Sequence, residues 1–270
     1  MTNRTISTDG RKRRPPVVLV VLAVLGLSVF VFPLLGLLAR TPWRDLPALL
    51  TSDIVLDALR VSLIASLGAT AISAILGVPL AWILARVEFP GRSIVRGLVV
   101  LPLVLPPVVG GAALLFALGR RGLIGEPLNE ATGLVFPFSI WGVIIAATFV
   151  AMPFLVITVE SGLRNLDTRY EGAAATLGAG RWTVLRRVTL PMIGPSLAAG
   201  LALTWARALG EFGATITFAG NLQGRTQTLP LAVFVALEGD RGAAVALSLI
   251  MVVISLAILV ALRQRWWGAL

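Results

Sequence analysis

The sequence predicts an all-α polytopic membrane protein with six transmembrane helices. Of its 270 residues, 57% are hydrophobic and only 13% are charged, whereas about 25% of the residues of a soluble globular chain are charged. The mean hydropathy of +0.92 also indicates a membrane protein. Six apolar segments reach the length of about 20 residues that a helix needs to cross a bilayer. They lie at about residues 17–39, 61–85, 97–118, 138–159, 192–219 and 243–262.

The first segment follows a basic tail, residues 1–16. Its apolar run from Val17 to Ala39 is longer than the core of a secretory signal peptide, which has about 7–15 residues, and no clear small-residue cleavage site follows it. We therefore interpret this run as a retained first span and residues 17–262 as one membrane domain.

Prolines interrupt the third segment, in the stretch LPLVLPPVVGG at residues 101–111. A proline removes a backbone donor and kinks a helix, and in lipid the freed carbonyls must be satisfied by protein or by a water-filled cavity. Broken helices of this kind often line a substrate path, but a simple packing kink is an equal alternative. The candidate helix-breaking residues are Pro102, Pro106 and Pro107.

The fifth segment carries ionisable residues, in the stretch TWARALGEFGATITFAGN at residues 204–221. On one continuous helix its polar side chains would fall within about 80° of one another and form a single stripe. Because ionisable residues at such depth are functional candidates, we expect Arg207 and Glu211 to form an outer-gate ion pair, within one chain or across a dimer axis. A structural salt bridge is the alternative. The candidate path or gate residues are Thr204, Arg207, Gly210, Glu211, Gly213, Thr215 and Asn221.

The distribution of positive charge predicts the topology. Six spans place both termini on the same side. That side, with its loops and both ends of the chain including residues 263–270, holds fifteen of the 23 Lys and Arg residues, and the opposite side holds six. Positively charged loops stay in the cytoplasm, so both termini and the longest inside loop, residues 160–190, are predicted to be cytoplasmic. On the outer side, the apolar run from Leu229 to Leu237 is too short to span and predicts a short helix.

Several function classes are disfavoured by what the sequence lacks. It contains no cysteine and no histidine, which excludes disulfides, thiol chemistry, Cys/His zinc sites and histidine acid–base catalysis. No phosphate-binding loop is present, and the basic residues do not gather as a nucleic-acid site would require. With Glu211 as the one carboxylate expected to be well buried, we predict neither an enzyme nor a bound metal or cofactor.

The stretch EGAAATLGAGRWTVLRRVTLP, residues 171–191, resembles the coupling motif of ABC-importer permeases. Ala173, Ala174, Gly178, Val188, Leu190 and Pro191 match that motif, and a short amphipathic helix is expected over residues 171–178. Gly172 stands where the family usually has glutamate, with Glu171 one place earlier, so the residue that makes the acidic contact stays open. The resemblance implies that the ATPase-coupling residues are Glu171, Gly172, Ala173, Ala174, Leu177, Gly178, Leu190 and Pro191.

Two further stretches narrow the resemblance. LPLVLPPVVGG and RALGEFGATITFAGN, the latter followed by GRTQTLPLAVF, look like molybdate/tungstate permeases, whose sulfate-importing relatives share a similar Gly-Glu-Phe-Gly segment. The resemblance implies a type I ABC-importer permease fold and a homodimer in the inner membrane of a prokaryote. It also implies cytoplasmic ATPase subunits and an extracytoplasmic oxyanion-binding protein as partners, with import of molybdate or tungstate by alternating access. A sulfate/thiosulfate permease and an ion-gradient-driven transporter are the alternatives.

Overall fold

The computed structural model describes residues 16–266, with side chains up to residue 260, and every regular element in this range is a helix. This confirms the predicted fold class. The chain forms two units, residues 1–41 and 42–270. The predicted basic tail lies outside the described residues apart from residue 16, and so do residues 267–270 of the predicted C-terminal end.

The first unit contains helix α1, Val17–Arg40, at the place of the first predicted span. Its most apolar stretch has a mean hydropathy of 2.9, and none of its side chains is buried. With a rise of about 1.5 Å per residue, 24 residues are long enough to cross a hydrocarbon core about 30 Å thick.

Three uninterrupted helices of the second unit are also long and apolar enough to span a membrane. They are α3 (Asp53–Arg86), α7 (Ile140–Asn165) and α14 (Arg241–Trp266), and they cover the second, fourth and sixth predicted segments. Four shorter helices connect or flank the spans: α2 (Leu46–Leu50), α6 (Gly125–Thr132), α8 (Arg169–Thr176) and α13 (Leu229–Gly239). The last of these is the short helix expected after Leu229.

The remaining two predicted spans are not straight helices. The third is divided into α4 (Arg92–Val104) and α5 (Pro107–Leu118), whose axes are bent by 120°. In the fifth, α9 (Arg181–Val184), a π-helical turn η1 (Leu185–Thr189) and α10 (Leu190–Met192) precede α11 (Gly194–Leu209) at a bend of 73°. A further break separates α11 from α12 (Gly213–Phe218). The prediction of one continuous helix over residues 192–219 is therefore wrong. The described residues contain four helices that could each span a membrane, or up to six spans if each bent pair of helices is counted as one.

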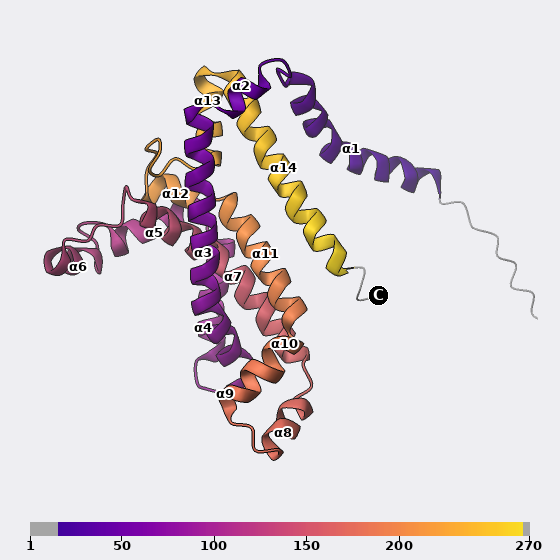
Figure 1. The fold of residues 1–270 in the computed structure, drawn as a ribbon, viewed down its shortest axis with the longest axis vertical. Helices are drawn as coiled ribbons and strands as arrows, with labels where there is room; N and C mark the ends of the chain where they lie inside the picture. Colours follow the sequence, from indigo (N-terminus) through magenta and orange to yellow (C-terminus); the bar gives the residue numbers. More distant parts are fainter. Residues whose placement is uncertain (1–15, 267–270) are drawn as a thin grey trace, which may run out of the picture. The chain divides into compact units, whose positions relative to one another are not determined.

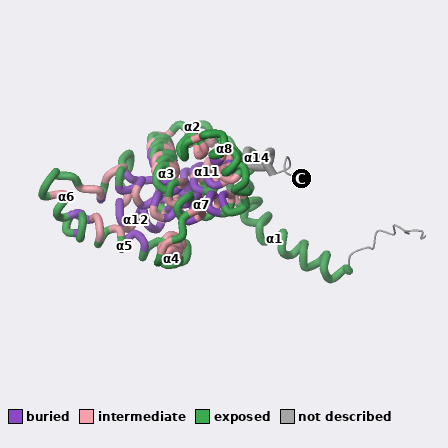
Figure 2. Tube along the Cα trace, turned by 90° about the horizontal axis from the view of Figure 1, so that it is seen from below, coloured by how far each residue is buried: buried purple, intermediate pink, exposed green. Residues whose placement is uncertain are grey.

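Small residues let the central helices approach closely. Helices α3, α7 and α11 share a buried cluster of alanines, Ala69, Ala147, Ala151 and Ala208. A Cβ on Gly200 of α11 would lie 3.0 Å from Leu155 of α7. Small residues at such contacts are typical of helix packing in membranes, where close van der Waals contact drives association. Buried positions accordingly concentrate on α7 and the helices around it (Figure 2).

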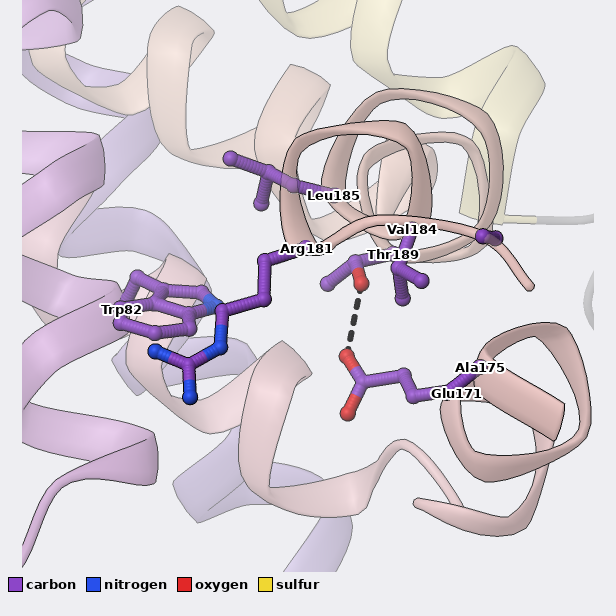
Figure 3. A pocket seen from close by; sticks show the side chains of 8 residues that line it. Trp82, Glu171, Ala175, Arg181, Val184, Leu185 and Thr189 are labelled. Carbon is purple, nitrogen blue, oxygen red and sulfur yellow. Dashed lines mark hydrogen bonds between the residues drawn. The ribbon is translucent and has the colours of Figure 1, made fainter.

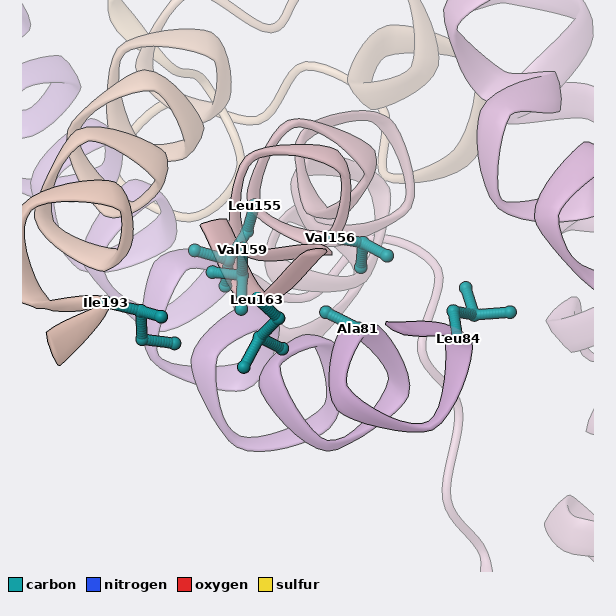
Figure 4. Packing of buried hydrophobic residues seen from close by; sticks show 7 residues of the cluster. All are labelled: Ala81, Leu84, Leu155, Val156, Val159, Leu163 and Ile193. Atoms are coloured by element: carbon teal, nitrogen blue, oxygen red, sulfur yellow. The ribbon is translucent and has the colours of Figure 1, made fainter. Parts of the chain in front are cut away.

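The two ends of the α3–α7 pair carry different elements (Figure 1). Helices α8, α9 and α10 lie at the end where α3 terminates, and α2 and α13 lie at the end where α3 begins. At the first of these ends, a buried cluster joins α3 and α7 to Ile193, directly after α10 (Figure 4). Leu190 packs against this cluster, so the segment that follows α8 is anchored to the buried core formed by α3 and α7.

Candidate functional site

Helix α8 contains the first part, residues 171–176, of the stretch that resembles a coupling motif, and local interactions define both ends of the helix. Before the helix, the Asp167 carboxylate accepts bonds from the Arg169 side chain (2.8 Å) and backbone N–H (2.9 Å). Both bonds hold the pKa of Asp167 below its ordinary value of 3.8, and the side-chain bond has the larger effect. After the helix, Gly178 has a φ of +83°, and the N–H groups of Gly178 and Ala179 donate to the carbonyls of Ala175 and Ala174. This is the Schellman arrangement, which favours glycine.

Part of the exposed surface of α8 is made of small, apolar residues. Ala173 and Gly172 are exposed, Ala174 is half-buried, and the Leu177 side chain directly after the helix is 88% exposed. A Cβ on Gly172 would meet open space. An exposed leucine beside alanine and glycine allows the backbone of a partner to approach closely, which is the property expected of a docking helix.

Glu171, in contrast, is turned toward its own chain. Its Oε1 accepts a hydrogen bond of 2.6 Å from the hydroxyl of Thr189, a residue that is 1% exposed (Figure 3). Its Oε2 lies 3.2 Å from a guanidinium nitrogen of Arg86, an ion pair that lacks the alignment of a hydrogen bond. The carboxylate thus ties α8 to η1 and to the end of α3.

A cavity of about 290 Å³ lies between α8 and the following helical segment. Glu171 and Ala175 contribute to one wall, and Arg181, Leu185 and Trp82 of α3 contribute to the others (Figure 3). The π-helical turn in this wall comes shortly before Pro191. Because proline has no N–H, it cannot bond the carbonyl of Arg187, and this missing bond accounts for the widened turn. Pro191 itself is exposed.

A second buried carboxylate, which was not predicted from the sequence, lies at the same end of the α3–α7 pair. Glu160, near the end of α7, is 7% exposed, and its Oε1 accepts bonds from Arg96 Nε of α4 (3.1 Å) and Arg164 Nε (3.0 Å). The prediction that Glu211 is the one well-buried carboxylate is therefore wrong. The signal available in the sequence was the spacing of four residues between Glu160 and Arg164, which brings two side chains together on a helix.

The break between α11 and α12 is built around Glu211. Its Oε2 pairs with Arg207 Nη1 at 2.7 Å, within the chain, and its Oε1 accepts a bond of 2.7 Å from Ala214 N–H in the first turn of α12. Gly210 ends α11. The Glu211 side chain is only 2% exposed, so both of its oxygens are satisfied in a place where an unpaired charge would be costly.

Because the helix breaks at this point, the other predicted stripe residues are divided between two helices. Thr204 lies on α11 and Thr215 on α12, both are fully buried, and neither hydroxyl has a hydrogen-bond partner among the described residues. Asn221 follows α12, and its buried Oδ1 is also unpaired within that range. The predicted stripe of four polar residues on one continuous helix is wrong, whereas the pair of Arg207 and Glu211 is present.

The two proline- and glycine-rich stretches of the sequence meet in the structure. Pro102 lies inside α4, and α5 begins after Pro106. A Cβ on Gly213 would lie 2.7 Å from Cβ of Pro107, and one on Gly111 would lie 2.8 Å from the carbonyl oxygen of Ala214. Glycine is required at both positions by the close contact of α5 with α12. The two helix breaks are thus packed against each other.

The comparisons with known proteins agree with this architecture. The sequence profile of the family "Binding-protein-dependent transport system inner membrane component" matches residues 77–266. The "Molybdenum transport system permease protein ModB" of Mycobacterium tuberculosis is 46% identical over 245 residues, 90% of this chain and 92% of that protein. The "Sulfate transport system permease protein CysT" of Escherichia coli K12 is 38% identical over 82% of this chain and 80% of that protein.

A solved structure shares the fold. A chain of a bacterial alginate ABC transporter, in complex with its alginate pentasaccharide-bound periplasmic protein, has a TM-score of 0.70 and 19% sequence identity, over 92% of each chain.

Proposed function

Because the chain belongs to the family of binding-protein-dependent transport system inner membrane components, we propose that it is the permease subunit of an ABC importer that moves molybdate across the cytoplasmic membrane. The assignment of molybdate as the substrate rests on the similarity, over 90% of the chain, to a permease named for molybdenum transport. The permease named for sulfate is less similar, which makes sulfate the second candidate. Tungstate has the same shape and charge as molybdate and is expected to compete with it.

The proposed partners follow from the two ends of the molecule. At the end of α8, an ATPase subunit binds the exposed surface of Ala173 and Leu177 and hydrolyses the ATP. At the end of α13, an extracytoplasmic protein delivers the oxyanion. The functional unit is a homodimer of this chain, with both termini in the cytoplasm.

The coupling mechanism that we propose is alternating access. ATPase closure moves α8, and the contacts of Glu171 with Thr189 and Arg86 transmit that movement to η1 and α3. The anchoring of Leu190 in the core cluster carries it on to α11. At the far end of α11, the pair of Arg207 and Glu211 acts as a gate beside the packed breaks of α5 and α12. Since the pair has no net charge, it does not hold a dianion tightly, and the substrate is able to leave.

The test is uptake by proteoliposomes that contain the chain, its ATPase and its binding protein. We expect uptake of radiolabelled molybdate that needs ATP, that excess tungstate abolishes and that excess sulfate leaves mostly intact. ATP-dependent uptake of sulfate that molybdate does not inhibit would assign the chain to the sulfate permeases. Uptake that follows an ion gradient without the ATPase would contradict the importer proposal.

A further inference from the structure

The end of the molecule opposite α8 holds a cavity that none of the roles above uses. It has a volume of about 390 Å³ and lies between the start of α3, the start of α7 and the connection from α12 to α13. This is well above the volume of about 30 Å³ that one water molecule occupies in the liquid. The cavity therefore accommodates a small oxyanion together with part of its hydration shell.

Two arginines from separate elements line this cavity, Arg60 of α3 and Arg225 of the connection. Both are exposed, and within the described part of the chain neither guanidinium forms a salt bridge or a side-chain hydrogen bond. A guanidinium presents a planar set of donors that matches the oxygens of an oxyanion. Val61, Ile64 and Ile140 supply apolar wall between them, and apolar walls strengthen the field of charges of one sign in a cleft.

The connection that carries Arg225 is held firmly against α3. Gly224 has a φ of +70°, and a Cβ there would lie 3.3 Å from an Asp57 carboxylate oxygen. Thr226 is fully buried, and its Oγ1 accepts a bond of 2.9 Å from Leu222 N–H. Leu229 N–H donates to the hydroxyl of Ser62 at 2.7 Å. The position of the Arg225 backbone relative to Arg60 is thus fixed before any ligand arrives.

This arrangement also gives a role to residues of the GRTQTLP run. The glycine permits the turn beside Asp57, the threonine and the leucine attach the connection, and the arginine is the one charged residue that the run places on the cavity wall. Helix α3, which lines the cavity, also contacts the helix that carries Arg207, since Ser66 of α3 accepts a bond from Trp205 of α11 at 3.0 Å. Ser66 is six residues beyond Arg60, about 9 Å along the helix.

We infer that Arg60 and Arg225 form a transient receiving site for a small tetrahedral dianion, which the anion occupies between its release by the binding protein and its passage beyond the gate pair. The inference deepens the proposed function and rests on it for the identity of the anion. Because both guanidiniums face solvent, binding is weak and sensitive to salt. Asp57 lies next to the turn and opposes the anion, so its charge limits the affinity.

The cavity can be tested directly because the chain contains no cysteine. Ile64→Cys places a single thiol on the cavity wall in the full chain, in lipid nanodiscs without ATPase or binding protein. We expect an anionic methanethiosulfonate reagent to react faster, relative to a cationic one, than it does with a free thiol. Arg60→Gln and Arg225→Gln should each slow the anionic reagent about fivefold and accelerate the cationic reagent by a similar factor, which lowers this ratio about 25-fold, since a charge pair at 4 Å in water is worth about 1 kcal/mol. Arg121→Gln, an exposed arginine of the α5–α6 connection, is the matched control.

Protection by the anion is the second readout. Molybdate, tungstate or sulfate should slow the labelling of Ile64→Cys. Addition of Arg60→Gln or Arg225→Gln should remove most of this protection. Addition of Asp57→Asn should lower the anion concentration needed for protection about fivefold. Equal protection with and without the arginines would overturn the site. So would protection by the binding protein but by no free oxyanion, since the arginines would then contact protein carboxylates. These readouts need no transport, so a failure of the uptake assay alone would contradict the proposed function and leave the site standing.

Discussion

At the scale of single residues, each oxygen of a carboxylate buried in a membrane domain needs a partner, and Glu211 meets this condition in two ways. One oxygen pairs with Arg207 and the other accepts the N–H of Ala214. The same residue therefore neutralises a cation in the spanning region and caps the helix that follows the break. A mutation of Glu211 removes both functions, whereas a mutation of Arg207 removes only the first.

This asymmetry predicts the outcome of a double-mutant cycle. Breaking a buried pair by removing one partner costs about 3–5 kcal/mol, whereas apolar replacement of both can be nearly neutral. We expect Arg207→Met and Glu211→Leu each to lower the folded yield. The double mutant should recover only part of it, because Ala214 N–H still lacks its acceptor. Glu211→Gln with Arg207→Met, which keeps an acceptor, should recover more.

Uptake by the same variants tests the gate. If the double mutant folds but does not transport, the pair acts as a gate; full recovery of both would leave a structural lock only. Normal transport by Glu211→Leu together with inactive Arg207→Met would contradict both roles and would make Arg207 a direct contact of the anion.

Glu160 gives a second prediction at this scale. Its carboxylate joins α4 to α7 through Arg96, and its own side chain is 9% exposed while that of Arg164 is 47% exposed. Glu160→Gln should destabilise the chain by about 1–3 kcal/mol, since hydrogen bonds to charged groups are lost and Arg96 loses its counter-ion. Arg164→Gln should cost less than about 1 kcal/mol, as exposed pairs do. Thermal unfolding in detergent measures both, and equal effects would show that burial of Glu160 does not matter.

At the scale of elements, α8 combines an exposed surface with an internal attachment. Leu177→Ser should reduce copurification of the ATPase without changing the thermal stability of the membrane domain, because the side chain is 88% exposed. Leu123→Ser, which replaces a leucine that is 85% exposed and lies outside α8, is the control. Loss of stability in Leu177→Ser, or unchanged copurification, would exclude this surface as the docking site.

Glu171 should behave differently from Leu177. Glu171→Gln keeps an acceptor for Thr189 but loses the ion pair with Arg86, so we expect the ATPase to stay bound while its hydrolysis becomes less dependent on the loaded binding protein. The exchanged pair, Arg86→Glu with Glu171→Arg, should restore part of the coupling. Loss of ATPase binding in Glu171→Gln that the exchange does not repair would mean that Glu171 contacts the partner directly.

The elements also show how far the sequence alone determines this fold. Hydropathy located each long helix, and the glycine at position 178 located the end of α8 to within two residues. Prolines 102–107 indicated a broken helix, but the bend of 120° depends on the contact of Pro107 with Gly213, which lies more than a hundred residues away. The break at Gly210 was missed because the spacing of four residues between Arg207 and Glu211 also fits a continuous helix. Glu160 was assigned to a loop because the apolar run ends directly before it, and its partner Arg96 is too distant in sequence to indicate the contact.

At the scale of the whole molecule, the two ends of the α3–α7 pair are chemically distinct. One end holds the coupling helix and the Glu160 cluster, and the other holds the cavity of Arg60 and Arg225. With 34 residues, α3 is about 50 Å long, which is longer than the hydrocarbon core of about 30 Å, so the helix extends beyond the hydrocarbon. The proposed function requires these ends to face opposite compartments.

The charge asymmetry of the loops predicts which end faces the cytoplasm, and single cysteines can test it. Gly180 is suitable on the α8 side, since its φ is −65° and a Cβ there meets open space. On the other side Gly224 is unsuitable because of its positive φ, whereas the neighbouring Gln223 is exposed. In right-side-out vesicles we expect an impermeant maleimide to label Gln223→Cys and not Gly180→Cys, and permeabilisation should make both reactive. Labelling of Gly180→Cys in sealed vesicles would reverse the orientation, and would then place the arginine cavity in the cytoplasm, where it could not receive an anion from outside.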